Sequence, residues 1–379
     1  MTEFRYTMDD VRAMWGRPYE EQIAVMQAKI LDAVRRTDGG IAVSYSGGKD
    51  SGMLLEQAAK CWAMVYGDSR PLVVIWANTG CEFKSMWPFV QRFTHCLEDR
   101  HGIRIDLRCV SAKQPFARTI REIGYPFPSK KIARMVSDVR AQMQAIGVRY
   151  DEIKPYIHGG LPAARAMRER GFSPVVVCDV TGIKSDGNPG TCVIPVRWAP
   201  LLGAPFEVSH RCCQIHKKGP IRTIERELGG LMPMVGEMAA NSKTRLDSYR
   251  RTGCNQFGGG KRVSKPMGPM TEQTVNRYYY ETGLPLAPPY GEPVLVNGGY
   301  RFSGEQNTGC KLCGFGIMYD WDRFVRLAKL EPETVRWAFK PVAEGGLGYG
   351  EVCRYINEYC GGKIALPDVK GGMPGDEKL

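Results

Sequence analysis

Residues 41–51 have the sequence IAVSYSGGKDS and combine two structural signals. The apolar run 41–45 predicts a short buried strand, and the apolar residues from Gly52 to Tyr66 predict a helix. Residues 46–51 therefore form the turn between a strand and a helix. Because the backbone amides at the start of a helix attract anions, this arrangement predicts a phosphate-binding loop.

The alternation of strands and helices continues on both sides of this loop. Apolar residues at helical spacing predict a helix that ends in a glycine turn, and two further apolar runs predict strands. These expected elements are a helix over 19–36, a strand over 71–77, a helix over 85–95 and a strand over 103–110. Such an order predicts a doubly wound, mostly parallel α/β sheet of the Rossmann-like kind, with its ligand beyond the carboxyl ends of the strands.

The regular pattern weakens between about residues 129 and 209, so we expect an insertion there. We expect a nucleotide-binding domain over 1–299, including this insertion, and a C-terminal cysteine-bearing segment over 300–379 that closes on the core. The glycine-rich, basic residues 254–268 predict a surface loop.

The composition is that of a globular protein, with 43% hydrophobic and 24% charged residues. No apolar run approaches the roughly 18 residues that a membrane span needs, and the charged N-terminal residues do not resemble a signal peptide. The thirteen cysteines are scattered, without the density of a secreted disulfide scaffold. We therefore expect a cytoplasmic protein without a membrane partner.

The formal net charge of +12 favours polyanionic partners, and nucleotides and nucleic acid both fit this preference. The same charge also serves solubility alone, so it supports these partners without selecting one. The sequence predicts no oligomeric state.

The residue types of the loop suit a phosphate. Gly47 and Gly48 allow close backbone approach, the hydroxyls of Ser46 and Ser51 add donors, and Lys49 supplies a cation for developing charge. The loop is not a Walker A motif, which has four residues between its glycines.

Two cysteine pairs lie far apart in the sequence. Cys212 and Cys213 are adjacent, and Cys310 and Cys313 form a Cys-x-x-Cys motif. Four thiolates suit either a [4Fe-4S] cluster or a structural zinc ion, and the spacing leaves both open. Cys254, alone in its loop, is not included in this set.

The sequence Ser-Gly-Gly-Lys-Asp-Ser at residues 46–51 resembles the signature of PP-loop enzymes, which use adenine nucleotides at the α-phosphate or release pyrophosphate. Residues 211–220 are similar to the Cys-Cys stretch of adenosine phosphosulfate (APS) reductases. Residues 268–275 and 284–286 resemble that family's Trp-Thr-Glu-x-x-Val and Leu-Pro segments. From about residue 40 to 315, the chain thus resembles the phosphoadenosine phosphosulfate (PAPS) reductase family.

This resemblance implies a ligand set and a nucleotide site. It implies a [4Fe-4S] cluster held by Cys212, Cys213, Cys310 and Cys313, and an adenine nucleotide, ATP, APS or PAPS, with Mg²⁺ as a candidate companion ion. In the family the loop after the second strand borders the nucleoside. The implied nucleotide-binding residues are Ser44, Ser46, Gly47, Gly48, Lys49, Asp50, Ser51, Asn78, Thr79 and Gly80, with Lys49 and Asp50 also catalytic.

Two departures separate the chain from the reductases. The nucleophilic cysteine of the reductases lies in a Glu-Cys-Gly-x-His motif. Residues 358–363 match this motif only loosely, and Cys360 is the residue that aligns with the nucleophile, so it is the candidate catalytic thiol. Glu237 stands where the reductases usually carry an arginine, which removes a charge-assisted partner for a sulfate. Lys243 and Arg245 are candidate phosphate contacts.

Three functions fit these observations. The first is ATP-dependent, iron-sulfur-dependent sulfur transfer, with nucleic acid as a candidate acceptor and a cysteine desulfurase as a candidate sulfur donor, by analogy with the related DNA phosphorothioation sulfurtransferases. The second is assimilatory reduction of APS or PAPS to sulfite, with thioredoxin as the reductant. The third is a non-catalytic nucleotide-binding protein.

Overall fold

The computed structural model describes residues 4–258 and 262–368. It divides into two compact units: unit 1 comprises Met1–Ala112 and His216–Cys310, and unit 2 comprises Lys113–Ile215 and Lys311–Leu379. The expected insertion at 129–209 falls entirely in unit 2. The division into domains over 1–299 and 300–379 stays a prediction.

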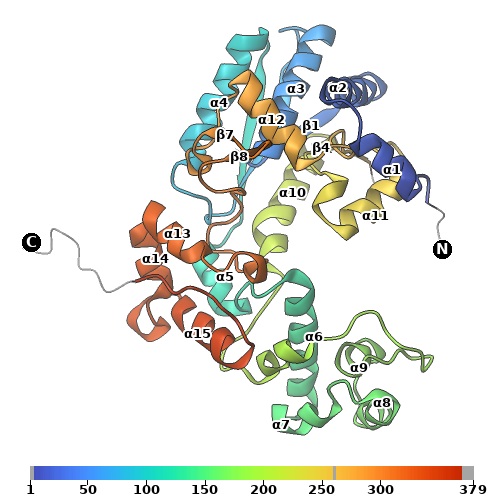
Figure 1. Ribbon diagram of the computed structural model, residues 1–379, viewed down its shortest axis with the longest axis vertical. Coiled ribbons are helices and arrows are strands. Elements are labelled where there is room, and N and C mark those ends of the chain that lie inside the picture. Colours follow the sequence, from blue (N-terminus) through green and yellow to red (C-terminus); the bar gives the residue numbers. More distant parts are fainter. Residues whose placement is uncertain (1–3, 259–261, 369–379) are drawn as a thin grey trace, which may run out of the picture. The chain divides into compact units, whose positions relative to one another are not determined.

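A six-stranded sheet forms the centre of unit 1 (Figure 1). Its strands are β1 (Ile41–Tyr45), β2 (Leu72–Asn78), β3 (Ile105–Ser111), β4 (Met232–Val235), β5 (Asn255–Gln256) and β6 (Val263–Ser264). The strand order is β3-β2-β1-β4-β6-β5, and every pairing is parallel except that of β5 with β6. The expected α/β architecture with a mostly parallel sheet is confirmed.

Helices flank this sheet. Those of unit 1 are α1 (Met8–Trp15), α2 (Tyr19–Arg36), α3 (Lys49–Val65), α4 (Met86–His101), α10 (Gly219–Glu227), α11 (Lys243–Thr252) and α12 (Glu272–Thr282). Helix α3 packs against β1 and has α2, α4 and α12 as neighbours, while α10 packs against β2 and β3. A hairpin of β7 (Pro293–Val296) and β8 (Gly299–Phe302) packs on α12.

The local predictions agree with these elements except at three places, one of which is α4, which ends at His101 rather than at residue 95. Helix α3 begins at Lys49 rather than at Gly52, so that Lys49, Asp50 and Ser51 form its first turn. The prediction that 254–268 is a surface loop is wrong at both ends of this range, since β5 and β6 lie there and Val263, Ser264 and Met267 are buried. Residues 259–261 of this prediction lie outside the described residues. Two-residue strands are too short to produce an alternating apolar pattern, although β6 extends the sheet beside β4.

The core of unit 1 explains the apolar run that predicts β1. Ile41, Ala42 and Val43 are almost completely buried, as are Met53, Leu54 and other residues of α3 that cover the strand. A central parallel strand is covered on both faces, so its sequence is apolar without alternation.

Unit 2 is helical. Its helices are α5 (Phe116–Ile123), α6 (Lys130–Ile146), α7 (Tyr150–Ile153), α8 (Gly160–Glu169), α9 (Pro174–Thr181), α13 (Arg323–Leu330), α14 (Pro332–Phe339) and α15 (Tyr349–Tyr359). Tyr349 is the centre of an aromatic cluster, with ring centroids 5.4 to 6.2 Å from those of Tyr125, Phe127, Phe324 and Phe339. This cluster joins the two sequence segments of the unit. In the part of the chain that the structure describes, no helix has both the length and the apolar surface to span a membrane.

Candidate nucleotide site

The strand order places three loops at one edge of the sheet. Strand β1 lies between β2 and β4, so the order of the strands reverses at β1, and a ligand is expected beyond the carboxyl ends of strands at such a switch point. The loops after β1 and β4 touch, since a Cβ added at Gly236 would lie 3.2 Å from backbone atoms of Asp50 and Ser51. Ser44 lies within β1, in register with Ile75 and Val235.

The loop after β1 is held by its own hydroxyl groups. The Oγ atoms of Ser46 and Ser51 are 2.9 Å apart, the Ser46 amide donates to Ser51 Oγ, and Ser51 Oγ donates to the Gly48 carbonyl. Gly47 has a φ of 76°, and a Cβ there would lie 2.5 Å from the Met86 side chain. Only glycine suits this position, so the tight turn that leads into α3 depends on Gly47.

Lys49 is buried among protein groups, with 3% of its surface exposed. Its Nζ atom lies 3.1 Å from Glu272 Oε1 and 3.5 Å from Asp50 Oδ1, and it donates to the Gln306 carbonyl at 3.1 Å. Burial alone would lower the pKa of Lys49, but the neighbouring acidic groups of Asp50, Tyr290 and Glu272 outweigh it, so the pKa is raised. Lys49 is therefore a permanent cation at the start of α3.

Burial and neighbouring charges also act against each other on the pKa of Asp50. Burial raises the pKa of its carboxyl, and the opposing charges of Lys49 and Arg245 do not fully offset this effect, so the pKa is raised. Asp50 Oδ1 is buried and accepts no hydrogen bond from any residue that the structure describes. Arg245, in the first turn of α11, thus brings a second cation to this edge of the sheet.

A segment distant in sequence covers the start of α3. The Lys49 amide donates to the Tyr290 hydroxyl at 3.0 Å, and Thr308 Oγ1 donates to the same hydroxyl at 3.0 Å. On the other side, the Tyr279 hydroxyl donates to the Lys49 carbonyl at 2.8 Å. The Tyr290 hydroxyl thus accepts the hydrogen bond of the Lys49 amide, a donor that would otherwise be open to a phosphate oxygen.

Motifs and periodicity do not identify the residues of this covering segment. Tyr290 and Gln306 lie more than 200 positions from the loop and belong to no motif that predicts a contact with it. Glu272 does fall in the segment that resembles the family's Thr-Glu-x-x-Val motif, and this likeness was the one available signal for its position beside Lys49.

The loop after β2 is organised around Thr79. Its amide donates to Glu82 Oε2 at 3.1 Å, its hydroxyl also donates to that carboxylate, and it accepts from the Cys81 amide at 3.2 Å. The Gly80 amide donates to Asn78 Oδ1 at 3.0 Å. Thr79 Oγ1 also lies 3.6 Å from the sulfur of Cys310, so the predicted nucleoside loop and a predicted cluster ligand are neighbours.

The four predicted cluster ligands belong to different parts of the chain. Cys310 ends unit 1, whereas Cys212, Cys213 and Cys313 belong to unit 2. Cys212 is buried and the other three are half-buried. Within residues 4–258 and 262–368, no three His, Cys, Asp or Glu side chains gather into a metal-binding group. The ligand set therefore stays a prediction.

The local structure around two of these motifs is well defined. The carbonyl of Leu312, between the cysteines of the Cys-x-x-Cys motif, accepts from the Tyr349 hydroxyl at 2.8 Å. The neighbouring Lys311 pairs with Glu331 at 2.6 Å, and both side chains are about nine-tenths buried. Cys212 and Cys213 directly precede η3 (Gln214–Lys218), a π-helical turn of the kind found frequently at functional sites.

Cys360 is enclosed at the end of α15, with 1% of its surface exposed. Burial raises the pKa of its thiol to about 12, against a smaller opposite effect of Arg197. A reactive cysteine needs a lowered pKa and access to solvent. The catalytic role of Cys360 stays a prediction, and this environment weighs against it.

Comparison with known proteins found no relative of this chain: no protein-family model matches it, and no curated protein matches it significantly.

Proposed function

We propose that this chain is a PP-loop enzyme of the PAPS reductase type that binds ATP and performs iron-sulfur-dependent sulfur transfer, with nucleic acid as the acceptor class. The observation that carries the proposal is the position of the Ser46–Ser51 loop. It joins β1 to α3 at the switch point of a parallel sheet, with the loops after β2 and β4 on either side.

The groups around this loop suit the α-phosphate and pyrophosphate of ATP. The amides at the start of α3 and the hydroxyls of Ser46 and Ser51 provide donors, and Gly48 caps the helix without a side chain that would compete. Lys49 and Arg245 provide positive charge to offset the charge that develops on the leaving pyrophosphate. Asp50 keeps the Lys49 ammonium group in place.

The proposed ligands of the cluster are Cys212, Cys213, Cys310 and Cys313. As a donor set they fit a [4Fe-4S] cluster, because four thiols with restricted access to solvent are the ligands that such clusters take. When bound, the cluster would supply an iron site with affinity for sulfur. Thr79, beside Cys310, would position the strand-end loop between this cysteine and the nucleotide.

The proposed reaction has two displacements. An oxygen atom of the acceptor attacks the α-phosphorus of ATP and pyrophosphate leaves; sulfur then attacks the acceptor atom that carries the adenylate and AMP leaves. With a protein persulfide as the sulfur donor, the product of the second step is a mixed disulfide, which a dithiol such as thioredoxin must reduce. Mg²⁺ would accompany the ATP as part of the substrate.

The alternative of APS or PAPS reduction requires a nucleophilic thiol on the C-terminal segment. The burial of Cys360 and the raised pKa of its thiol disfavour it. Glu237, in the loop after β4, further disfavours a sulfate group at this edge of the sheet.

One set of assays on anaerobically purified protein tests the proposal. We expect exchange of labelled pyrophosphate into ATP when acceptor nucleic acid is present, and no sulfite from APS or PAPS with thioredoxin. Sulfite release at an ordinary enzymatic rate, together with its loss in Cys360→Ser, would overturn the proposal in favour of the reductase. The absence of both reactions would leave a non-catalytic nucleotide-binding protein.

A further inference from the structure

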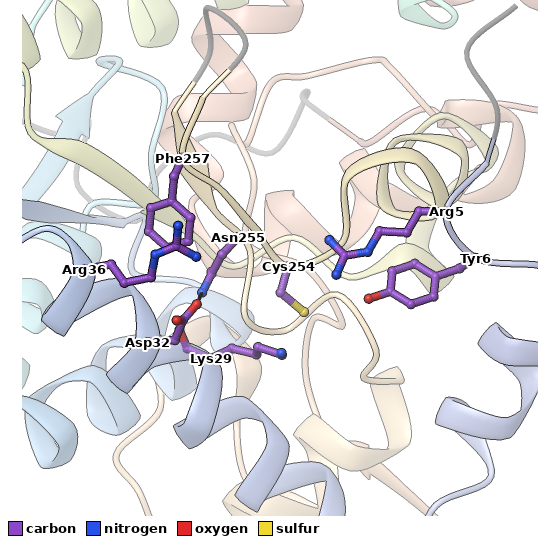
Figure 2. A pocket seen from close by; sticks show the side chains of 8 residues that line it. All are labelled: Arg5, Tyr6, Lys29, Asp32, Arg36, Cys254, Asn255 and Phe257. Carbon is purple, nitrogen blue, oxygen red and sulfur yellow. Dashed lines mark hydrogen bonds between the residues drawn. The ribbon is translucent and has the colours of Figure 1, made fainter.

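A pocket of about 340 Å³ lies in unit 1 among residues that the proposed reaction does not use. Three separate segments line it (Figure 2): the N-terminal residues before α1, the exposed side of α2, and the region around β5. The lining residues are Arg5, Tyr6, Lys29, Asp32, Arg36, Cys254, Asn255 and Phe257.

The pocket carries an excess of positive charge. Arg5, Lys29 and Arg36 line it, and none of the three forms an ion pair with a residue that the structure describes. Asp32, the one carboxylate among the described lining residues, instead accepts a hydrogen bond from Asn255 Nδ2 at 2.8 Å. Three cations that have no carboxylate partner among the described residues favour an anionic ligand.

Aromatic rings are interleaved with these cations. The Arg36 guanidinium lies 3.8 Å from the centroid of the Phe257 ring, and Figure 2 shows the two groups stacked at one end of the pocket. Arg5 lies over the ring of Tyr6 at 5.3 Å. Stacked arginine and aromatic groups present flat faces to a ligand, which suits a nucleobase whose phosphate meets the neighbouring cations.

The same pairing continues outside the pocket. The guanidinium groups of Arg250 and Arg251, near the end of α11, lie 3.9 and 5.2 Å from the centroid of the exposed Phe4 ring. Tyr6 ties this strip to the pocket, because its amide donates to the Arg250 carbonyl at 3.0 Å and its ring stacks on Tyr249. The basic aromatic surface therefore extends beyond the space that one nucleotide fills.

We infer that this surface, comprising the pocket and the Phe4, Arg250 and Arg251 strip, binds a single-stranded segment of nucleic acid. One base would enter the pocket beside Phe257, and adjacent phosphates would contact Arg5, Lys29 and Arg36. A duplex keeps its bases stacked and does not offer one to so small a pocket. A free nucleotide has the same chemistry but leaves the strip without a ligand.

The inference rests on the proposed function only where it treats the bound strand as the sulfur acceptor. Binding itself requires neither ATP nor turnover. The two proposals can therefore fail separately. If the protein binds the strand but never exchanges pyrophosphate, only the proposed function is wrong. If it exchanges pyrophosphate with an acceptor that does not need this surface, only the inferred binding surface is wrong.

The test is fluorescence anisotropy of the full-length protein with a labelled single strand of roughly 12 nucleotides, at several salt concentrations and without ATP. We expect Phe257→Ala to weaken binding about tenfold at an unchanged salt dependence, because a stacking partner is lost. Arg36→Ala should weaken binding and also lower the salt slope by about 0.7, as expected for one lost phosphate contact to a single strand. Thermal melts verify that each variant is folded.

The matched control is Arg92→Ala, which removes an exposed arginine of α4 outside the surface and should leave binding unchanged. Three results would each overturn the inference. Phe257→Ala could bind the strand as tightly as the parent, which would indicate a charged patch open to any polyanion, including an acidic peptide. A duplex of the same length could bind as tightly as the strand, or AMP could displace the strand as effectively as an unlabelled oligonucleotide does.

Discussion

The hydroxyl oxygen of Thr79 lies 3.6 Å from the sulfur of Cys310, although the two residues are 231 positions apart in the sequence. One belongs to the loop after β2 that is predicted to border a nucleoside, and the other opens the Cys-x-x-Cys motif. Thr79 and Cys310, one residue from each of two motifs that the sequence presents separately, are therefore neighbours within unit 1. This contact places one proposed cluster ligand beside the loop that is predicted to border the nucleoside.

The first prediction concerns the cluster. Anaerobically purified protein should be brown and contain about four irons and four sulfides per chain, because four thiolates hold one cubane cluster. Cys310→Ser should lose the colour and most of the iron, as measured by absorbance and iron analysis. Cys109→Ser, which changes an exposed cysteine on β3, is the control and should keep both. Colourless parent protein with stoichiometric zinc would contradict the assignment.

The second prediction concerns Lys49. Lys49→Ala should abolish pyrophosphate exchange, because the cation at the start of α3 is lost. It should also destabilise the fold by about 1–3 kcal/mol, because Asp50 loses its charge partner and the Gln306 carbonyl loses its donor. Exchange assays and chemical denaturation measure the two effects.

Lys60→Ala provides the control for Lys49, since it removes an exposed lysine from the same helix. It should leave exchange and stability unchanged. If Lys49→Ala exchanged pyrophosphate at the parent's rate, the loop would have no part in the mechanism.

The third prediction concerns Tyr290. Its hydroxyl accepts from the Lys49 amide, so a bound phosphate must displace it before that amide can donate to the nucleotide. Tyr290→Phe removes this competitor and should tighten ATP binding about threefold to tenfold, at a cost of about 1 kcal/mol in the stability of the nucleotide-free protein. Isothermal titration calorimetry and thermal melts measure both quantities.

The control for this change is Tyr280→Phe, which alters a half-exposed tyrosine of α12 and should change neither quantity. Weaker ATP binding by Tyr290→Phe would show that the phenol contacts the nucleotide rather than competing with it.

The fourth prediction concerns Cys360. In the native protein at pH 8, iodoacetamide should modify the exposed Cys109 and leave Cys360 unmodified until the chain is denatured, because Cys360 is buried and its thiol pKa is about 12. Peptide mass mapping measures the modification of each. Rapid alkylation of Cys360 in the folded state would mean that the C-terminal segment opens, as a sulfonucleotide reductase requires.

The same pKa has a consequence for stability. Folding raises the pKa of the Cys360 thiol from an ordinary value of 9.0 to about 12, so the folded state holds this proton more tightly than the unfolded state does. The contribution of this buried, protonated thiol to the free energy of unfolding is therefore complete below about pH 9 and is lost as the pH rises towards 12.

The sequence alone determined the central architecture of unit 1. The apolar run Ile41–Tyr45, the helical spacing over Tyr19–Arg36 and the glycines between strand and helix predict elements that the structure contains. These features are local, because burial on both faces of a strand or on one face of a helix leaves its mark in consecutive residues. The position of the Ser46–Ser51 loop at the sheet edge follows from the same pattern.

Only the tertiary structure decided what surrounds that loop. Lys49 was expected to face a phosphate, yet it lies buried beside Glu272 and Gln306, and its amide is bonded to Tyr290. Likewise, Arg5, Arg36 and Phe257 line one pocket although they come from three separate segments. Contacts of this kind depend on how side chains pack after distant segments meet, and because no short stretch of sequence carries that geometry, periodicity and motifs could not predict them.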